Sequence, residues 1–425
     1  MAKKKFSLGL TFLFGIVGLV VGATLGGAGA YAKANGVFGN RTESTKFEGV
    51  VYDDFQIHFM MLGNDAAGDS IYIKAGDTDI LIDAGSEVSS YETTSAYIDK
   101  YCTDGKLEYV IATHGDSDHI AAFPKLLDHY ETGIIINNHR TTKTTSTYTN
   151  MVNAFNKEVE NGAKWYSVED CYNNANGGSR EYKLSDSVTM TILYNYYYFN
   201  EASDENDYSV VTLFTYESVG IKKYFFLGGD LEKSGEEKLA AFYDGSTSEK
   251  TLPTVQLYKA GHHGSKTSSN DVLLNILQPE MCVVCCCCGT NEYTNITENQ
   301  FPTQQFIDRI AKWTDSVYVT SIYDSYTIET NTNSSSYKGV ASGGQYIKTS
   351  GFKPMNGNII VSSGLVTLPS SVEGMSEGVP DVAIGLACSN NTTKLKDSDW
   401  MKTKVTIDGV ERYVRTMPSQ WASSN

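Results

Sequence analysis

Residues 113–119, Thr-His-Gly-Asp-Ser-Asp-His, concentrate side chains that bind metal ions. They follow the apolar run 109–112, which predicts a short buried strand. Four potential ligands lie within six residues: His114, Asp116, Asp118 and His119. A helix would scatter them, and a regular strand would turn His119 away from the other three. Because a tight loop at a strand end can turn all four inward, the segment predicts a site for zinc, manganese or iron rather than calcium.

Two later segments repeat this pattern of an apolar strand that ends in potential ligands. Residues 224–230 end in Gly-Gly-Asp230, where the carboxylate is either a helix N-cap or a metal ligand. Residues 255–265 end in Gly-His262-His263-Gly-Ser265, and paired histidines between glycines seldom fill a core. Three strand ends that deliver His and Asp together predict a site for two metal ions.

Charge and length limit the class of protein. A chain of 425 residues is long enough for one large domain or two ordinary ones. The net charge of −16 argues against a broad electrostatic grip on nucleic acid. It still allows a small site that binds one phosphodiester through metal.

The N-terminal segment predicts export. Lys3, Lys4 and Lys5 precede residues 6–32, which carry no charge and are numerous enough to span a bilayer. Ala30-Tyr31-Ala32 resembles a signal peptidase site, so residues 1–32 are either a membrane anchor or a cleaved signal peptide. Residues 33–49 are polar and predict a linker.

Five of the eight cysteines lie within residues 282–288. Exported proteins often form disulfides, but this run lacks the paired spacing of a zinc site and lies between Pro279 and Gly289. It predicts a buried strand, in which adjacent thiols point to opposite faces and do not pair.

The order of the remaining elements predicts two sheets between layers of helices. Strands begin near residue 55, helices are expected over 88–101, 121–130, 149–163, 232–243, 270–277 and 303–312, and strands separate them. We therefore expect one domain over residues 50–362. Residues 363–425, Ser- and Gly-rich with an apolar patch at 382–387, predict an irregular C-terminal extension without a readable role.

Together these motifs resemble the metallo-β-lactamase fold superfamily, in particular the branch related to the hydrolase domain of the ComEC/Rec2 competence proteins. The resemblance covers residues 55–326. It rests on several segments, which are His58-Phe59 through Asp83-Ala84-Gly85, residues 113–119 as the HxHxDH motif, Asn206 to Val211, Leu227 to Asp230, and Lys259 to Ser268.

The resemblance implies an α/β fold, an αββα four-layer sandwich with the metal site at the sheet edge. It also implies two divalent ions, zinc or manganese, with a hydroxide between them as nucleophile. His114 and Asp116 would bind one ion, Asp118 and His119 the other, and Asp230 would bridge them. His262 or His263 would complete the second site. We expect Asp118, Asp230 and His263 to be catalytic, and Asp83 to support the ligands by hydrogen bonds.

Ser265 and Lys266 follow the paired histidines. They are either donors to a substrate anion or part of a solvated turn.

The chain departs from the family pattern at four places. Asp116 replaces a histidine, which favours manganese more than an all-histidine site would. The separate third-motif histidine has no clear counterpart, so His129 and His139 are candidates by position only, and Asp207 lies where relatives carry Asn or Asp. The turn over residues 63–69 is two residues longer than the branch's Gly-Gln-Gly-Asp. Finally, the branch's Tyr-Gly-His-Pro loop corresponds to residues 291–302, which contain no histidine.

These features predict an exported metal-dependent hydrolase, with a phosphodiesterase as the leading interpretation. A cell-envelope or other small anionic substrate is favoured over single-stranded DNA by the negative charge. A non-catalytic metal-binding surface module is the alternative from another class.

Overall fold

The computed structural model describes residues 47–368 and 378–422. The predicted signal or anchor, residues 1–32, and nearly all of the predicted linker lie outside these ranges. No helix in the described ranges has the length and apolar character needed to cross a bilayer.

The first sheet has the strand order β1-β17-β16-β2-β3-β4-β5-β6-β7. From β1 through β17, β16, β2 and β3 to β4, neighbouring strands are antiparallel. Strands β4, β5, β6 and β7 run parallel. The strands are β1 (Glu48–Gly49), β2 (Phe55–Phe59), β3 (Ile71–Ala75), β4 (Thr78–Ile82), β5 (Lys106–Ala112), β6 (Glu131–Asn137), β7 (Lys164–Ser167), β16 (Ile359–Leu368) and β17 (Val379–Cys388).

The second sheet has the order β15-β14-β13-β12-β11-β10-β9-β8. Strands β11 to β14 run parallel, and the outer strands are antiparallel. The strands are β8 (Glu181–Lys183), β9 (Val188–Ile192), β10 (Thr212–Ser218), β11 (Ile221–Leu227), β12 (Leu257–Lys259), β13 (Cys282–Cys288), β14 (Val317–Thr330) and β15 (Gln345–Pro354).

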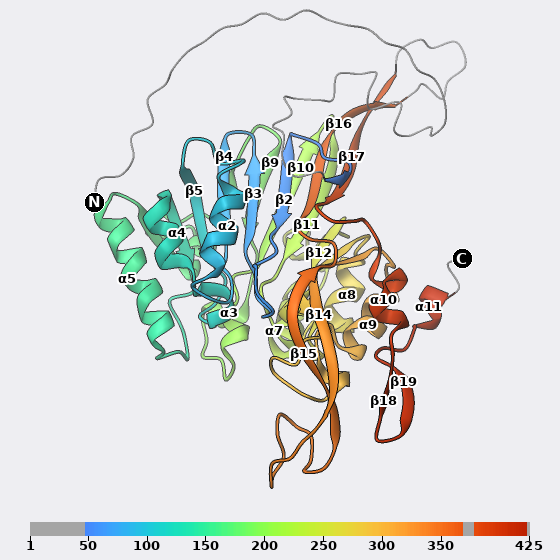
Figure 1. The fold of residues 1–425 in the computed structure, drawn as a ribbon. Helices are drawn as coiled ribbons and strands as arrows, with labels where there is room; N and C mark the ends of the chain where they lie inside the picture. The colour runs from blue at the N-terminus through green and yellow to red at the C-terminus, as the bar shows by residue number, and fades with distance from the viewer. Residues whose placement is uncertain (1–46, 369–377, 423–425) are drawn as a thin grey trace, which may run out of the picture. The chain divides into compact units, whose positions relative to one another are not determined.

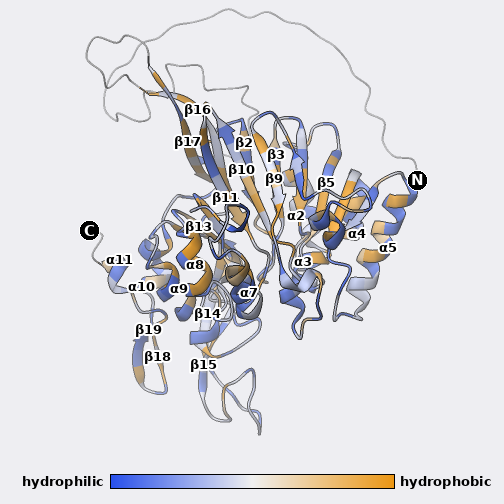
Figure 2. Cartoon of the chain, turned by 180° about the vertical axis from the view of Figure 1, so that it is seen from behind, coloured by the Kyte–Doolittle hydropathy of each residue, from blue (hydrophilic) through white to orange (hydrophobic). Residues whose placement is uncertain are grey.

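Helices cover the outer face of each sheet, so the expected αββα sandwich is confirmed (Figure 1). The helices are α2 (Ser90–Ile98), α3 (Ser117–Ile120), α4 (Phe123–His129), α5 (Ser146–Glu160), α6 (Val168–Asn173), α7 (Lys233–Phe242), α8 (Asp271–Leu277) and α9 (Gln304–Ile310). Phe155 of α5 and Phe123 of α4 pack on the first sheet, and Leu274 of α8 packs on the second. Between the sheets, Phe55 of β2 contacts Phe214 and Phe225. Figure 2 shows hydrophobic residues concentrated along the central strands, with the β15 end largely hydrophilic.

The cysteine-rich run forms β13, as the sequence predicts, and all eight cysteines of the chain are unpaired and buried. Val283 and Cys285 face the core between the sheets, whereas Cys282 and Val284 face the helical layer. A register shift between Val284 and Cys287 explains why the alternation breaks after Cys285.

The expectation of an irregular extension after residue 363 is wrong. The boundary falls inside β16, which pairs with β2 from Ile359↔Phe59 to Ser363↔Phe55, and the apolar patch at 382–387 lies in β17. The sequence alone did not show the pairings of β16 with β2 and of β17 with β1, because these partners lie far apart in the chain. After β17 come α10 (Asp399–Lys402), the hairpin of β18 (Lys404–Ile407) and β19 (Val410–Tyr413), and α11 (Ser419–Ala422).

The final segment packs beside the second sheet through Trp400 and Trp421. Arg415, which is 2% exposed, donates to backbone carbonyl oxygens of Thr297, Gln300 and Pro302. The C-terminal segment thus holds the loop that joins β13 to α9.

Candidate metal centre

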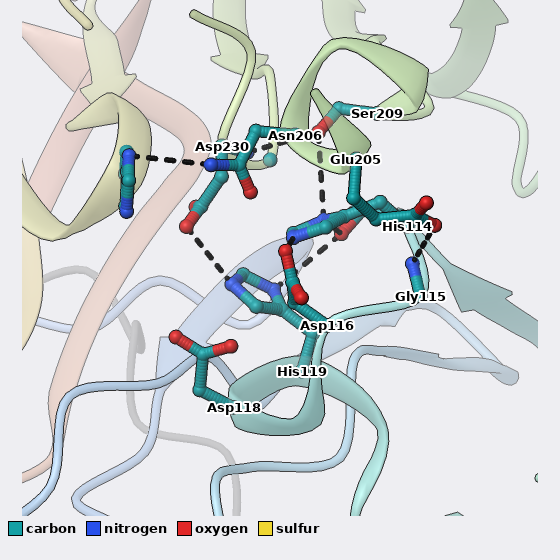
Figure 3. A network of polar contacts seen from close by, with 12 residues as sticks. His114, Gly115, Asp116, Asp118, His119, Glu205, Asn206, Ser209 and Asp230 are labelled. Carbon is teal, nitrogen blue, oxygen red and sulfur yellow. Dashed lines mark hydrogen bonds and ion pairs between the residues drawn. The ribbon is translucent and has the colours of Figure 1, made fainter. Parts of the chain in front are cut away.

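The predicted ligands come together where β4, β5, β11 and β12 end. These strands are parallel in pairs, β4 with β5 and β11 with β12, so their carboxyl ends lie at a common edge of each sheet. The β5 end carries residues 113–119, the β11 end carries Asp230, and the β12 end carries the paired histidines. Figure 3 shows His114, Asp116, Asp118 and His119 near Asp230.

Asp230 reaches the centre because glycine precedes it. Gly229 has φ +57°, and a Cβ there would lie 2.8 Å from Ser209 Oγ and 3.0 Å from Thr113 Cβ. The amide of Asp230 donates to Ser209 Oγ at 3.1 Å. Burial tends to raise the pKa of Asp230, but His119, His263 and Lys259 hold it well below its usual value. Asp230 is therefore a buried anion rather than a helix N-cap, since α7 begins three residues later.

His119 is oriented by Asp83. Its Nδ1 lies 2.7 Å from Asp83 Oδ2, and its Nε2 lies 3.1 Å from Asp230 Oδ2. Asp83 also accepts hydrogen bonds from the amide and hydroxyl of Thr113, at 2.8 and 2.7 Å. Burial would lower the pKa of His119, but Asp230 and Asp83 raise it well above normal. Asp83 thus hydrogen-bonds a histidine that the sequence predicts to be a metal ligand.

The two adjacent histidines point to different partners. His263 is buried, with Nδ1 2.9 Å from the carbonyl oxygen of Cys285 and Nε2 3.1 Å from Asp230 Oδ2. His262 Nδ1 instead pairs with Glu232 Oε1 at 3.0 Å, and its side chain is 23% exposed. Both residues have left-handed backbone, with φ 45° and 53°, which costs about 1–2 kcal/mol per residue. The strained turn separates the two rings, and His263 is the one that joins the buried cluster.

Asp69 completes that cluster, although the sequence did not single it out as a site residue. Asp69, His119, Asp230 and His263 each offer one ligand atom, all within 4.8 Å of one another, and all four are buried. Asp69 ends the long turn between β2 and β3, which the resemblance aligned with the branch's Gly-Gln-Gly-Asp turn without giving Asp69 a role. The amide of Asp69 donates to the carbonyl oxygen of Asp118 at 3.2 Å, which ties this turn to the 113–119 loop.

Lys259 lies within the same cluster. Its ammonium contacts Asp69 Oδ2 at 2.5 Å and Asp230 Oδ1 at 3.1 Å, and the side chain is fully buried. Burial would lower the pKa of Lys259, but the two carboxylates raise it above normal. Lys259 therefore neutralises part of the negative charge beside the histidines.

His114 and Asp116, the residues predicted to bind the first ion, lie at the rim. His114 Nε2 is 3.6 Å from Asp116 Oδ2, and within the described residues this buried nitrogen has no hydrogen-bond partner. Burial and His119 lower the pKa of His114 well below normal, so its imidazole is neutral. Asp116 forms an ion pair with Lys143. Asp118 lies 3.3 Å from His263 Nε2.

The other predicted residues lie outside the cluster. Ser265 Oγ bonds with Thr267 Oγ1 at 2.9 Å, and Lys266 donates to Asn299 Oδ1 at 3.0 Å. Asp207 accepts from the amide of Gly235 at 3.0 Å, at the start of α7, while its neighbour Asn206 lies 3.5 Å from His262 Nδ1.

Neither candidate for the third-motif histidine reaches the cluster. His129 pairs with Asp99 at 2.9 Å, and the His139 ring lies 5.3 Å from that of Trp165.

The arrangement fits a divalent cation. The Nε2 atoms of His119 and His263 are 3.3 Å apart, while their Nδ1 atoms are anchored elsewhere. Both nitrogens face Asp230 Oδ2, and His114 adds an unpartnered nitrogen nearby. Two imidazoles and two carboxylates suit zinc or manganese better than calcium.

Comparison with known proteins agrees with this geometry. Residues 63–187 match the family model of the Metallo-beta-lactamase superfamily, so this part of the chain is similar to that superfamily. Members of the superfamily are generally metal-dependent hydrolases, and the fold typically binds two divalent metals. The search of curated proteins gave no match.

Solved structures of the same fold class overlap only partly with this chain. MEM-A1, a subclass B3 metallo-beta-lactamase from a soil metagenome library, is 14% identical over 41% of this chain and 63% of its own length, with a TM-score of 0.27. YhfI, a metallo-beta-lactamase fold protein from Bacillus subtilis, is 12% identical over 64% of this chain and 97% of its own length, with a TM-score of 0.33. MIM-1 from Novosphingobium pentaromativorans is 12% identical over 41% of this chain and 62% of its own length, with a TM-score of 0.26. These scores are low, and we infer nothing about activity from them.

Proposed function

We propose that the protein is an exported hydrolase that cleaves phosphodiesters at this centre. The observation that carries the proposal is the buried cluster of Asp69, His119, Asp230 and His263, delivered by four separate segments. Buried charged groups are expensive unless they are paired or bind a metal, so such a cluster indicates a functional site.

The residues of the centre divide into ligands and supports. Asp69, His119, Asp230 and His263 would hold one divalent ion, and His114 with Asp118 extends the donor set toward a second. When bound, such ions supply a nucleophile from water at neutral pH and stabilise charge on a phosphoryl group. Asp83 fixes the tautomer and direction of His119, and Lys259 balances the charge of the two buried carboxylates.

The substrate class follows from charge. Phosphodiesters suit a two-ion centre, because both the attacking and the leaving oxygen can be stabilised. With a net charge of −16, the chain favours a small or cell-envelope phosphodiester over DNA. The uncharged segment 6–32 supports export, as anchor or as signal peptide. Likeness to the ComEC/Rec2 branch keeps single-stranded DNA as the alternative substrate.

Metal analysis and turnover test the proposal together. The full chain, loaded with zinc or manganese, should bind metal and hydrolyse bis-p-nitrophenyl phosphate. Asp230→Asn and His263→Ala should lose both metal and turnover. His129→Ala is the matched control, because this histidine pairs with Asp99 on the helical layer and should leave both unchanged. A metal-replete protein without turnover would refute the hydrolase.

A non-catalytic binding module is the second candidate. It is favoured by the ion pair of Asp116 with Lys143, which occupies one predicted ligand. Under this alternative the protein binds one ion and shows no turnover in any metal. A salt titration of single-stranded DNA binding tests whether DNA is the substrate. Binding that does not depend on salt would argue against contacts to phosphates.

A further inference from the structure

The loop between β13 and α9, residues 289–303, forms one wall of the metal centre. The amide of Thr303 donates to the carbonyl oxygen of Gly264 at 2.9 Å, next to the paired histidines. The Phe301 ring lies 5.7 Å from the His262 ring and 6.1 Å from the His263 ring. Side chains of this loop therefore lie next to the paired histidines.

Tyr293 brings a hydroxyl group to the centre from this loop. Its Oη donates to Asp118 Oδ2 at 3.2 Å, and its ring lies 5.7 Å from that of Phe301. The residue is 53% exposed, so a ligand arriving from solvent can reach it. Asp118 in turn lies 3.3 Å from His263 Nε2, so the hydroxyl is one residue removed from the buried cluster.

The part of the loop that carries Tyr293 is held from two sides. Ala67, in the turn that ends at Asp69, donates its amide to Glu292 Oε2 at 2.8 Å. Lys338, between β14 and β15, donates to the carbonyl oxygens of Asn291 and Glu292 and accepts from the amide of Asn295 at 2.9 Å. A donor held in this way needs little reorganisation when a ligand binds, which is what makes fixed donors effective.

The donors expected from the sequence are engaged elsewhere. Ser265 bonds with Thr267, and Lys266 donates to Asn299. Tyr293 differs, because its partner Asp118 is itself a predicted metal ligand. When the oxygens of Asp118 turn to a cation, the phenol hydroxyl can donate to another anion at the same place.

We propose that Tyr293 contacts the substrate, and that its hydroxyl donates a hydrogen bond to a non-bridging oxygen of the phosphoryl group bound at the centre. The inference rests on the proposed function and deepens it. It involves no covalent step, since the proton stays on the tyrosine. The Phe301 ring packs against that of Tyr293, tilted by 50°.

Calorimetric titration with inorganic phosphate tests this directly. The zinc- or manganese-loaded full chain is compared with Tyr293→Phe, and with Tyr413→Phe as control, an exposed tyrosine of β19. We expect Tyr293→Phe to weaken phosphate binding by about tenfold, as for loss of one hydrogen bond to a charged group. Metal content should not change, and the control should bind phosphate as the parent does.

Each other outcome overturns the inference in a distinguishable way. Equal phosphate affinity for the parent and Tyr293→Phe, with bis-p-nitrophenyl phosphate still hydrolysed, removes the role of Tyr293 and leaves the hydrolase intact. Loss of metal from Tyr293→Phe would mean that the tyrosine only positions Asp118. Absence of both phosphate binding and turnover in the parent would remove the proposed function and this inference with it.

Discussion

Replacing Arg415 with methionine should destabilise the protein by about 3 kcal/mol. The guanidinium donates to the carbonyl oxygens of Pro302 at 3.0 Å, Thr297 at 2.7 Å and Gln300, and it lies 4.8 Å from the Trp400 ring. Thr297 keeps the amide of Gln300 as a donor, but the carbonyl oxygens of Pro302, Gln300 and Val414 lose theirs. Each loss costs about 1 kcal/mol, and the lost cation–π contact adds about 0.5–1 kcal/mol. Methionine fills much of the space and removes a buried charge, so the net destabilisation is smaller than the sum of these costs.

Urea unfolding measures the effect, with Trp fluorescence as the signal because Trp400 lies against Arg415. Burial lowers the pKa of Arg415 to about 10, so the residue remains charged throughout a titration at neutral pH. Arg412→Met is the matched control, since Arg412 is exposed and forms a surface ion pair with Glu298, at 3.2 Å. Such surface pairs contribute about 0–1 kcal/mol. If the two variants unfold within about 1 kcal/mol of each other, the C-terminal segment does not hold the loop as described.

Three further outcomes follow from particular contacts. Asp83→Asn should weaken zinc binding about ten- to a hundredfold, because it removes the charge that orients His119. Competition with a chromophoric chelator measures the zinc affinity. Unchanged affinity would contradict the role of Asp83 in orienting His119. Burial raises the pKa of Glu236 to about 7 from 4.5, so the folded state binds more protons and the stability of the protein falls as the pH rises from about 4.5 to about 7. Across this window Glu236→Gln should gain up to about 3 kcal/mol of stability relative to the parent, as measured by urea unfolding. A stability difference that stays constant with pH would refute the raised pKa. Burial raises the pKa of Cys285, Cys286 and Cys288 well above normal, so a colorimetric thiol reagent should react with the chain only in denaturant; rapid reaction of the native protein would contradict the burial of β13.

The ligand-bearing strand ends were predictable from sequence because their signal is local. An apolar run followed by His or Asp marks a strand that ends at a site, and His119, Asp230 and His263 were found in this way. Asp69 and Lys259 lacked this strand-end signal, and only the resemblance of residues 63–69 and 259–268 to motifs of the branch covered them. Asp69 lies in a polar turn where aspartate is common, and Lys259 follows an apolar run in which a lysine would ordinarily point to solvent.

The orientation of neighbouring side chains could not be predicted from the sequence either. Left-handed backbone at His262 and His263 decides which ring enters the cluster, and non-glycine residues rarely adopt it. Similarly, the short 3₁₀ helix Glu205–Tyr208 turns Asn206 toward His262 and Asp207 toward α7. A shift of one residue would exchange these roles, and no composition or periodicity signal reports it.

The pairing of β2 with β16 joins strands that are far apart in the chain. The edge of β2 stays open until the ribosome has made Ser363, because that residue pairs with Phe55. Contacts across such a separation close slowly, since the intervening chain must lose its freedom first. A polypeptide that is to be threaded through a membrane must remain unfolded until it has crossed. Completion of the first sheet therefore waits for the late strand, which is compatible with the export that we propose.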